Sequence, residues 1–224
     1  MDWQFYYNLE GSEQVRANLV YTPYVSADNK TFCMSFNRDT AYHKNNDGWT
    51  EEILTERYNR ELEFYVRAKK VVPTLDIIDI DPTERKIYLE WFGDDFYMQG
   101  LSNGYESVLP QWQEQWLSCV RNLWSANITK MSLHPNSWVS RGGELVPFNW
   151  FFSYDSADTL TIQDVAIQIS AGRKDKLDQE LSSVGMDYTT KYSVKKLQHI
   201  TFNSFRSNYP KELIDTIIQE LSWE

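Results

Sequence analysis

Glycine and cysteine are both scarce in this sequence, whose 224 residues include 9 Gly and 2 Cys. Cys33 and Cys119 are too few for the disulfide framework of a small secreted domain. Each cysteine lies in an apolar stretch, where a free buried thiol is the expected state. A disulfide-stabilised scaffold is therefore excluded, and the fold must depend on a hydrophobic core.

Long apolar runs are absent as well. No run approaches the ~20 residues that a helix needs to cross a bilayer. The N-terminal residues 1–7 (MDWQFYY) lack the basic region and the apolar stretch of a signal peptide. We therefore expect a cytoplasmic protein that has no membrane partner.

Positive charge is also in short supply, since 22 Lys and Arg stand against 32 Asp and Glu, for a net charge of −10. Binding to a phosphate backbone requires clustered Lys and Arg, so a nucleic-acid partner is disfavoured. The carboxylates are spread along the chain, which fits an acidic mimic of nucleic acid poorly. His43 and His199 have no Cys or His at ligand spacing, so no zinc site is expected.

Aromatic residues are plentiful by contrast, at 15% of the chain with 9 Trp, and 42% of all residues are hydrophobic. Such a composition indicates a folded chain rather than a disordered one. Trp112, Trp116 and Trp124 recur at helical spacing and are expected in the core. Five other tryptophans are expected to be less buried: Trp49, Trp91, Trp138, Trp150 and Trp223. Tryptophan is enriched at interface hot spots, so some of these five are expected at a surface that binds a partner.

The first 92 residues show a β-rich pattern that contains one helix. Alternating stretches at 15–25 and 31–36, separated by turn residues at 27–30, predict two strands. Thr50 predicts a helix N-cap, with apolar spacing that continues to about residue 70. This spacing places Glu61 on the apolar face, where a carboxylate is paired, hydrogen-bonded or extended to water. Residues 75–81 and 86–92 then predict a hairpin.

The remaining residues are mainly helical in pattern. Pro110 is expected as the first residue of an amphipathic helix that Asn127 closes. Short strands are expected at 138–139 and 145–154, around the turn at 141–144. From residue 161 onward the pattern is mostly helical, and a last helix is expected at 211–221. The fold class is therefore α+β.

Particular residues in this order resemble the protein-kinase-like fold, in its aminoglycoside- and choline-phosphotransferase branch. Residues 58–62 (YNREL) and 72–77 (VPTLDI) resemble the helix-C glutamate motif and the fourth strand. Residues 87–93 (IYLEWFG) resemble the fifth strand entering the hinge, and 133–139 (LHPNSWV) with 143–150 (GELVPFNW) resemble the catalytic loop and the metal-binding strand. The resemblance implies two lobes, a small β-rich N-lobe of residues 1–92 and a trimmed, mainly helical C-lobe of residues 93–224.

The sequence departs from this family where the chemistry would occur. The alignment places Ser132 at the catalytic aspartate and Lys130 at its histidine. Ser137, or Asn136 after a one-residue slip, falls on the metal-binding asparagine. Asn149 falls on the metal-binding aspartate. The degenerate cleft positions that the resemblance identifies are Ser35 (at the third-strand lysine), Glu61, Glu90, Ser132, His134, Asn136, Ser137 and Asn149.

Phosphoryl transfer requires Mg²⁺ held by carboxylates, a cation on the phosphates and a base near the hydroxyl. No glycine occurs between Gly11 and Gly48, so a glycine-rich phosphate loop is missing. These losses predict a pseudokinase that binds or regulates a protein partner, with no catalytic residue, no metal and no cofactor. His134 is expected to support the loop.

Two other functions stay open. A divergent phosphotransferase that uses ATP and Mg²⁺ is the first, with Asp155, Asp158 or Asp164 as a replacement metal ligand. An acidic decoy of a nucleic-acid-binding protein is the second. The trimmed C-lobe and the many tryptophans also resemble phage-encoded accessory proteins, which would imply a host cytoplasm.

Overall fold

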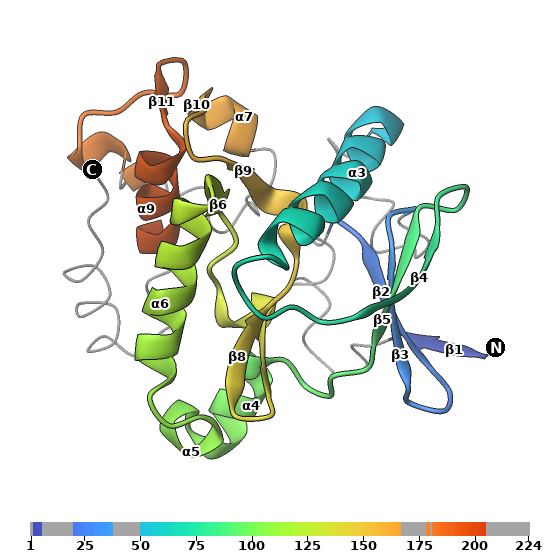
Figure 1. Ribbon diagram of the computed structural model, residues 1–224. Coiled ribbons are helices and arrows are strands. Elements are labelled where there is room, and N and C mark those ends of the chain that lie inside the picture. Colours follow the sequence, from blue (N-terminus) through green and yellow to red (C-terminus); the bar gives the residue numbers. More distant parts are fainter. Residues whose placement is uncertain (1, 6–19, 38–49, 167–177, 180, 205–224) are drawn as a thin grey trace.

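The computed structural model describes residues 2–5, 20–37, 50–166, 178–179 and 181–204, and Figure 1 shows their arrangement. The described residues form a mixed α+β fold with a small β-rich region at the N-terminal side. Within these ranges, the structure contains no helix with the length and apolar character required to cross a bilayer.

The N-terminal region contains a five-stranded antiparallel sheet in the order β1-β2-β3-β5-β4. The hairpin of β4 and β5 and the strand β3 confirm the sequence predictions, whereas β1 was not predicted. Residues 6–19, which include part of the predicted strand at 15–25, lie outside the described residues. The strands of this sheet are β1 (Trp3–Phe5), β2 (Thr22–Ser26), β3 (Thr31–Ser35), β4 (Ile77–Asp81) and β5 (Lys86–Glu90).

Helix α3 (Glu51–Ala68) follows the sheet strand β3 in the chain and begins where the sequence predicts. The Thr50 hydroxyl accepts a hydrogen bond from the Ile53 amide at 3.4 Å, and two glutamates occupy the first turn, where the helix dipole favours them. Leu54 and Tyr58 are buried against the sheet. Figure 1 shows α3 between the sheet and the segment around β9, so it joins the two parts of the molecule.

The rest of the described chain is built from helices and short strand pairs (Figure 1). The helices are α4 (Phe96–Asn103), α5 (Tyr105–Val108), α6 (Trp112–Ser125), α7 (Ile162–Ala166) and α9 (Val194–Ser204), with single turns η1 (Pro135–Ser137) and η2 (Trp150–Phe152). The strand pairs are β6 (Ile128–Lys130) with β9 (Ser153–Asp155), β7 (Trp138–Arg141) with β8 (Glu144–Pro147), and β10 (Thr159–Thr161) with β11 (Lys191–Ser193).

Three details of the sequence prediction were wrong in this region. Helix α6 begins at Trp112 with Gln111 as its N-cap, so Pro110 precedes the helix instead of opening it. The strand expected at 145–154 is broken at Asn149, whose φ of 64° turns the chain into η2. The pair β10 and β11 was not predicted. The helix expected at 211–221 lies outside the described residues. Asn127 follows α6 and has a φ of 60°, as expected of a residue that closes a helix.

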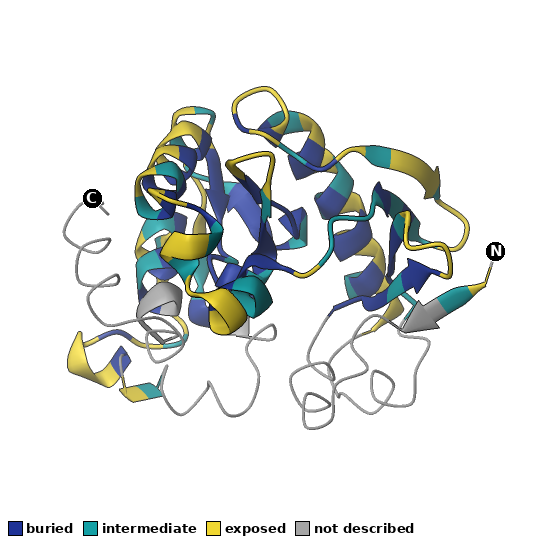
Figure 2. Cartoon of the chain, turned by 90° about the horizontal axis from the view of Figure 1, so that it is seen from below, coloured by how far each residue is buried: buried dark blue, intermediate teal, exposed yellow. Residues whose placement is uncertain are grey.

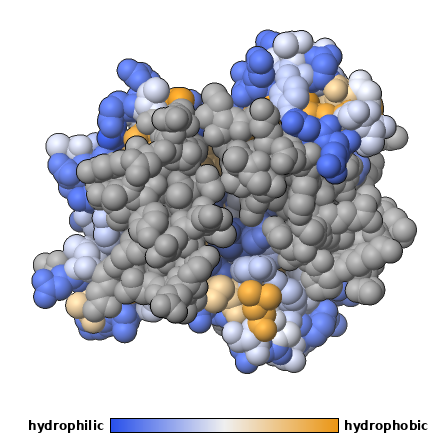
Figure 3. Space-filling model, turned by 180° about the vertical axis from the view of Figure 1, so that it is seen from behind, coloured by the Kyte–Doolittle hydropathy of each residue, from blue (hydrophilic) through white to orange (hydrophobic). Residues whose placement is uncertain are grey.

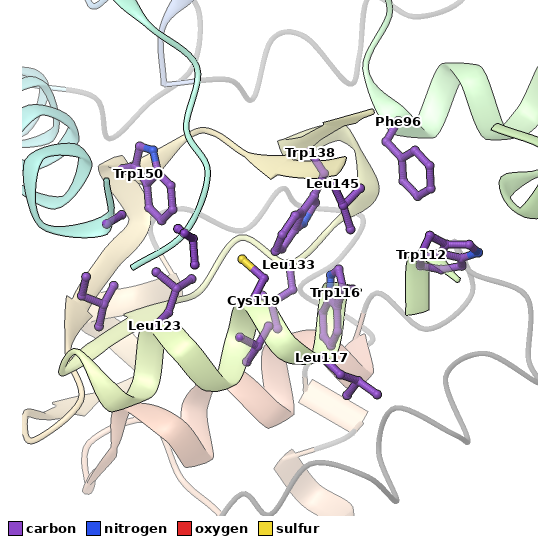
Figure 4. Close-up of a cluster of buried hydrophobic side chains, with 14 of the residues drawn as sticks. Phe96, Trp112, Trp116, Leu117, Cys119, Leu123, Leu133, Trp138, Leu145 and Trp150 are labelled. Atoms are coloured by element: carbon purple, nitrogen blue, oxygen red, sulfur yellow. The ribbon is translucent and has the colours of Figure 1, made fainter. Parts of the chain in front are cut away.

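Tryptophan forms much of the interior of the helical part (Figure 4). Trp112 and Trp116 on α6 are buried, as their spacing predicts. Trp138 and Trp150 are also fully buried, at 0% and 1% exposure, so the expectation that they contribute to a partner surface was wrong. In Figure 2 the buried residues lie mainly on the inner elements, and the exposed residues lie mainly around the outside. Trp49 and Trp223 lie outside the described residues.

Candidate functional site

The loop after β6, the second residue after β8 and the residue before β2 meet in a chain of uncharged hydrogen bonds. Ser132 Oγ lies 2.6 Å from Ser137 Oγ, and Asn149 Nδ2 donates to Ser137 Oγ at 3.3 Å. Tyr21 Oη donates to Asn149 Oδ1 at 2.7 Å. The structure therefore brings together three of the predicted positions, Ser132, Ser137 and Asn149, and adds Tyr21, which sequence reasoning missed.

The local backbone explains how these side chains are held. The His134 imidazole accepts a hydrogen bond from the Asn136 amide at 3.1 Å through Nδ1, which caps the turn η1. Pro135 opens that turn, and the His134 ring packs 5.0 Å from the ring of Tyr97. Through these contacts His134 holds the start of the turn and packs on α4. Asn136 lies beside the hydrogen-bonded chain, because Ser137 Oγ donates to Asn136 Oδ1 at 3.4 Å.

Glu61 lies on the buried face of α3 with 4% exposure. Its Oε2 accepts a hydrogen bond from the Phe151 amide at 2.6 Å. Burial raises the pKa of Glu61, while the Phe151 amide and the charge of Lys130 oppose that rise. The carboxylate therefore accepts from a backbone donor, which is the hydrogen-bonded state among those that the sequence left open.

Lys130 is the last residue of β6 and is also buried, with 1% exposure. Its ammonium donates to the carbonyl oxygens of Ser132 at 2.8 Å and Asn149 at 3.0 Å. The ammonium also lies 5.5 Å from the centre of the Trp150 ring. Burial lowers the pKa of Lys130, and the negative charge of Glu61 opposes that fall. Lys130 thus links the two segments that carry the uncharged hydrogen bonds. The sequence signal for a buried lysine with this linking role is its position between Thr129 and Met131 in an apolar stretch.

Three arginines of α3 fasten the helix to the segment 151–155. Arg57 donates to the Phe151 carbonyl at 3.3 Å, and Arg60 donates to the Ser153 carbonyl at 3.0 Å. Arg67 binds Asp155 at 2.5 Å. Because Asp155 is engaged by Arg67, and Asp164 accepts the Thr161 amide at 2.8 Å, neither points to a replacement metal ligand. Within the described ranges, no group of three or more His, Cys, Asp and Glu side chains is arranged to hold a metal ion.

The structure does not bring Ser35 to Glu61. Ser35 is fully buried at the end of β3, where it pairs with Thr22 and Lys86. Side chains alternate across a strand, and Phe36, the next residue, faces α3 with its ring 5.8 Å from that of Tyr58. The side chain of Ser35 therefore points to the opposite face of the sheet.

Glu90 is the last residue of β5, and it binds the Asp76 amide and Arg141, which lie on other elements than the uncharged hydrogen bonds. Its carboxylate forms a two-point contact with the Arg141 guanidinium on β7, one bond of which joins Nη2 to Oε2 at 2.7 Å. This ion pair connects the sheet to the β7–β8 hairpin at a partly exposed position.

Aromatic rings fill the space between the sheet and the β7–β8 hairpin. The Phe92 ring lies 5.0 Å from that of Phe32 on β3 and 5.0 Å from that of Phe148 after β8. The Tyr21 ring lies 5.8 Å from those of Phe36 and Phe151. These contacts make one continuous apolar cluster that runs from the sheet to the hairpin.

No protein-family model matches the sequence, and no curated protein matches it. The structure is similar to a crystal structure of WbdD, with a TM-score of 0.50 and 9% sequence identity over 98% of this chain and 50% of that chain. A second structure, titled as the bifunctional kinase-methyltransferase WbdD, gives a TM-score of 0.49 and 11% identity over 98% of this chain and 51% of that chain. The chain thus spans about half the length of WbdD. At this identity the likeness concerns the fold alone, which this chain shares with about half of the WbdD chain.

Proposed function

We propose that this chain is a pseudokinase, a kinase-like module that does not transfer phosphate and acts by binding a protein partner in the cytoplasm. In this proposal residues 1–92 are the N-lobe and residues 93–224 the C-lobe, with the boundary near Phe92. The observation that supports it best is the hydrogen-bonded chain of Ser132, Ser137, Asn149 and Tyr21. It occupies the positions that the resemblance assigns to the catalytic base and the metal ligands.

The chemistry of these side chains does not fit Mg·ATP. Mg²⁺ in such sites is held by carboxylates and substrate phosphates, and the three positions Ser132, Ser137 and Asn149 carry two hydroxyls and an amide. The amide oxygen of Asn149 already accepts from Tyr21, and its amide nitrogen already donates to Ser137. No general base is provided at position 132, because a serine hydroxyl is not ionised at neutral pH.

The filling of the junction by aromatic rings supports the same conclusion. The Phe92 ring lies 5.0 Å from the rings of Phe32 and Phe148, so a planar base placed here would compete with these ring contacts. Fully burying a phenylalanine side chain contributes about 1.5–3 kcal/mol to folding, so displacing one of these rings would oppose nucleotide binding.

The test is a thermal melt with and without ATP and Mg²⁺ or Mn²⁺. A ligand at 100 times its Kd would stabilise the folded state by about 2.7 kcal/mol, which is roughly 5–10 °C for a chain of this size. We expect no such rise, and no radiolabel transfer from ATP to a protein or a small molecule.

A divergent phosphotransferase is the second candidate, favoured by the buried, hydrogen-bonded Glu61 on α3. A clear rise in melting temperature with Mg·ATP, together with transfer that Asn149→Ala abolishes, would establish this candidate and overturn the pseudokinase proposal. An acidic decoy would rest on the net charge alone, and binding to a nucleic-acid-binding protein would be its test.

A further inference from the structure

Helix α3 is bound to one segment, residues 151–155, which runs from η2 into β9 (Figure 1). The contacts fall on every second residue of this segment and advance along the helix toward its last turn. They are the bonds from Arg57 to the Phe151 carbonyl at 3.3 Å, from Arg60 to the Ser153 carbonyl at 3.0 Å, and from Arg67 to the Asp155 carboxylate at 2.5 Å. The Phe151 amide donates to Glu61, so the helix holds both backbone groups of Phe151. Hydrogen bonds with a charged partner are roughly twice as strong as neutral ones.

Apolar packing crosses the same junction, between the sheet and the helical part of the chain that begins at Phe96. One hydrophobic cluster joins α3 to the helical part, and its members include Phe64, Tyr65, Leu123 and Ile128. A second cluster joins the sheet to the β7–β8 hairpin, and its members include Phe32, Ile87, Val139 and Val146. These residues are all buried, whereas the described surface seen from behind is mostly hydrophilic, with small separate apolar spots (Figure 3). Interior contacts that neither part completes alone therefore hold the two parts together.

Two polar contacts cross the junction from the sheet itself, without α3. Tyr21, directly before β2, donates to Asn149 Oδ1 at 2.7 Å. Glu90, the last residue of β5, forms a two-point contact with Arg141 on β7. A hinge motion that separated the sheet from the helical part would therefore have to break contacts at α3, at Tyr21 and at Glu90 together.

The linker at 91–95 is the place where such a hinge would lie. It contains neither helix nor strand, and Gly93 has a φ of 78°. Hinges are often a few loop residues that absorb changes in φ and ψ. The Phe92 ring, however, lies 5.0 Å from the ring of Phe32 on β3 and 5.0 Å from that of Phe148 after β8. The linker is therefore anchored to both parts.

We propose that α3 is a fixed clamp, so that the sheet and the helical part move as one body and the junction between them opens only when the whole domain unfolds. The inference goes beyond the proposed function, because it concerns motion and makes no claim about chemistry. Its consequence is that a partner meets a surface that is already formed. Binding would then neither open nor close the junction, as in complexes of pre-organised partners, whose interface backbone moves little.

Native-state hydrogen exchange of the full chain, read amide by amide by NMR, tests this proposal. The Phe151 amide reports on the junction, because it donates to Glu61 across it at 2.6 Å. The amides of β3 and β5, which pair with each other, report on the sheet. In a clamped molecule the Phe151 amide exchanges only through global unfolding, so its protection factor should lie within about tenfold of the largest values in β3 and β5. A protection factor that is more than about tenfold smaller would show that the junction opens by itself, and it would overturn the proposal.

The variant Arg60→Gln/Arg67→Gln tests whether α3 provides the clamp. Exchange of the Phe151 amide should become at least about tenfold faster relative to the amides of β3 and β5. The matched control is Arg85→Gln, because Arg85 also binds α3, through Thr55 at 3.0 Å and Glu51 at 2.6 Å, but lies in the turn between β4 and β5 and does not cross the junction. It should leave the ratio between the two sets of amides unchanged.

A double variant whose ratio equals that of the wild type, or a control that shifts the ratio as the double variant does, would overturn the assignment of the clamp to α3. If the double variant does not fold, the wild-type comparison still decides the proposal. ATP is left out of these experiments, and phosphate transfer is measured separately. A clamped phosphotransferase and a hinged pseudokinase would therefore give different results, so failure of this inference and failure of the proposed function are distinguishable.

Discussion

Replacing Glu61 by alanine should destabilise the protein by about 1–3 kcal/mol, because the Phe151 amide loses its acceptor. The Phe151 amide, which donates to Glu61 Oε2 at 2.6 Å, would be left without an acceptor, at a cost of about 1–3 kcal/mol. Lys130 would also lose a nearby negative charge, but it keeps two carbonyl partners, so we expect the upper part of this range and no more.

Chemical denaturation measures this effect, and Glu63→Ala is its matched control. Glu63 lies two residues away on α3, its side chain is 60% exposed, and its ion pair with Arg67 spans 3.3 Å, so its removal should change stability by less than about 0.5 kcal/mol. A double-mutant cycle with Lys130→Met should give a coupling energy of at least about 1 kcal/mol. A loss for Glu61→Ala as small as that for Glu63→Ala, or zero coupling with Lys130, would refute this reasoning.

Three further predictions concern the same part of the chain. Tyr21→Phe removes the hydroxyl that donates to Asn149 at 2.7 Å and should cost about 0.5–1.5 kcal/mol in denaturation, with a neutral result contradicting the contact. Thr50→Ala removes the N-cap of α3 and should cost about 1 kcal/mol, whereas Thr50→Ser should be nearly neutral. Burial raises the pKa of Glu61 and lowers that of Lys130. The folded state therefore binds protons more tightly at Glu61 and more weakly at Lys130 than the unfolded state does. The free energy of unfolding of the wild type, measured relative to that of Glu61→Gln/Lys130→Met, should fall as pH rises above 4.5 and recover toward pH 10.5. A difference that stays constant across that range would contradict the burial of both groups.

The elements that the sequence predicted correctly are those whose signals are local. Thr50, two glutamates and regular apolar spacing specify α3 within one stretch of chain. The β4–β5 hairpin is marked by its turn, where Asp81 accepts the amides of Thr83 and Glu84. The strands β10 and β11 were missed because each is three residues long and its partner lies about thirty residues away. Such short segments carry too little periodicity to identify a strand.

The candidate site was predicted in part. The loop at 132–137 and Asn149 were selected by motif, and the structure places their side chains within hydrogen-bonding distance. The partner of Glu61 was not predictable, because Phe151 provides a backbone amide, which any residue type can supply. The register of β3 was equally difficult, since a shift of one residue moves every side chain to the other face of the sheet. Met34 of β3 and Phe36 just after it pack in one cluster with Leu54 and Tyr58 of α3, whereas Ser35 does not.

The hydrogen bonds among Ser132, Ser137, Asn149 and Tyr21 have an evolutionary consequence. An aspartate at position 149 would lose the amide hydrogens that reach Ser137 and would bury a charge, because this side chain is 5% exposed. An aspartate at position 132 would replace a hydroxyl that lies 2.6 Å from Ser137 and would crowd it. Either substitution by a charged residue therefore destabilises the fold before it can serve any chemistry. We expect related sequences to change these positions together or not at all.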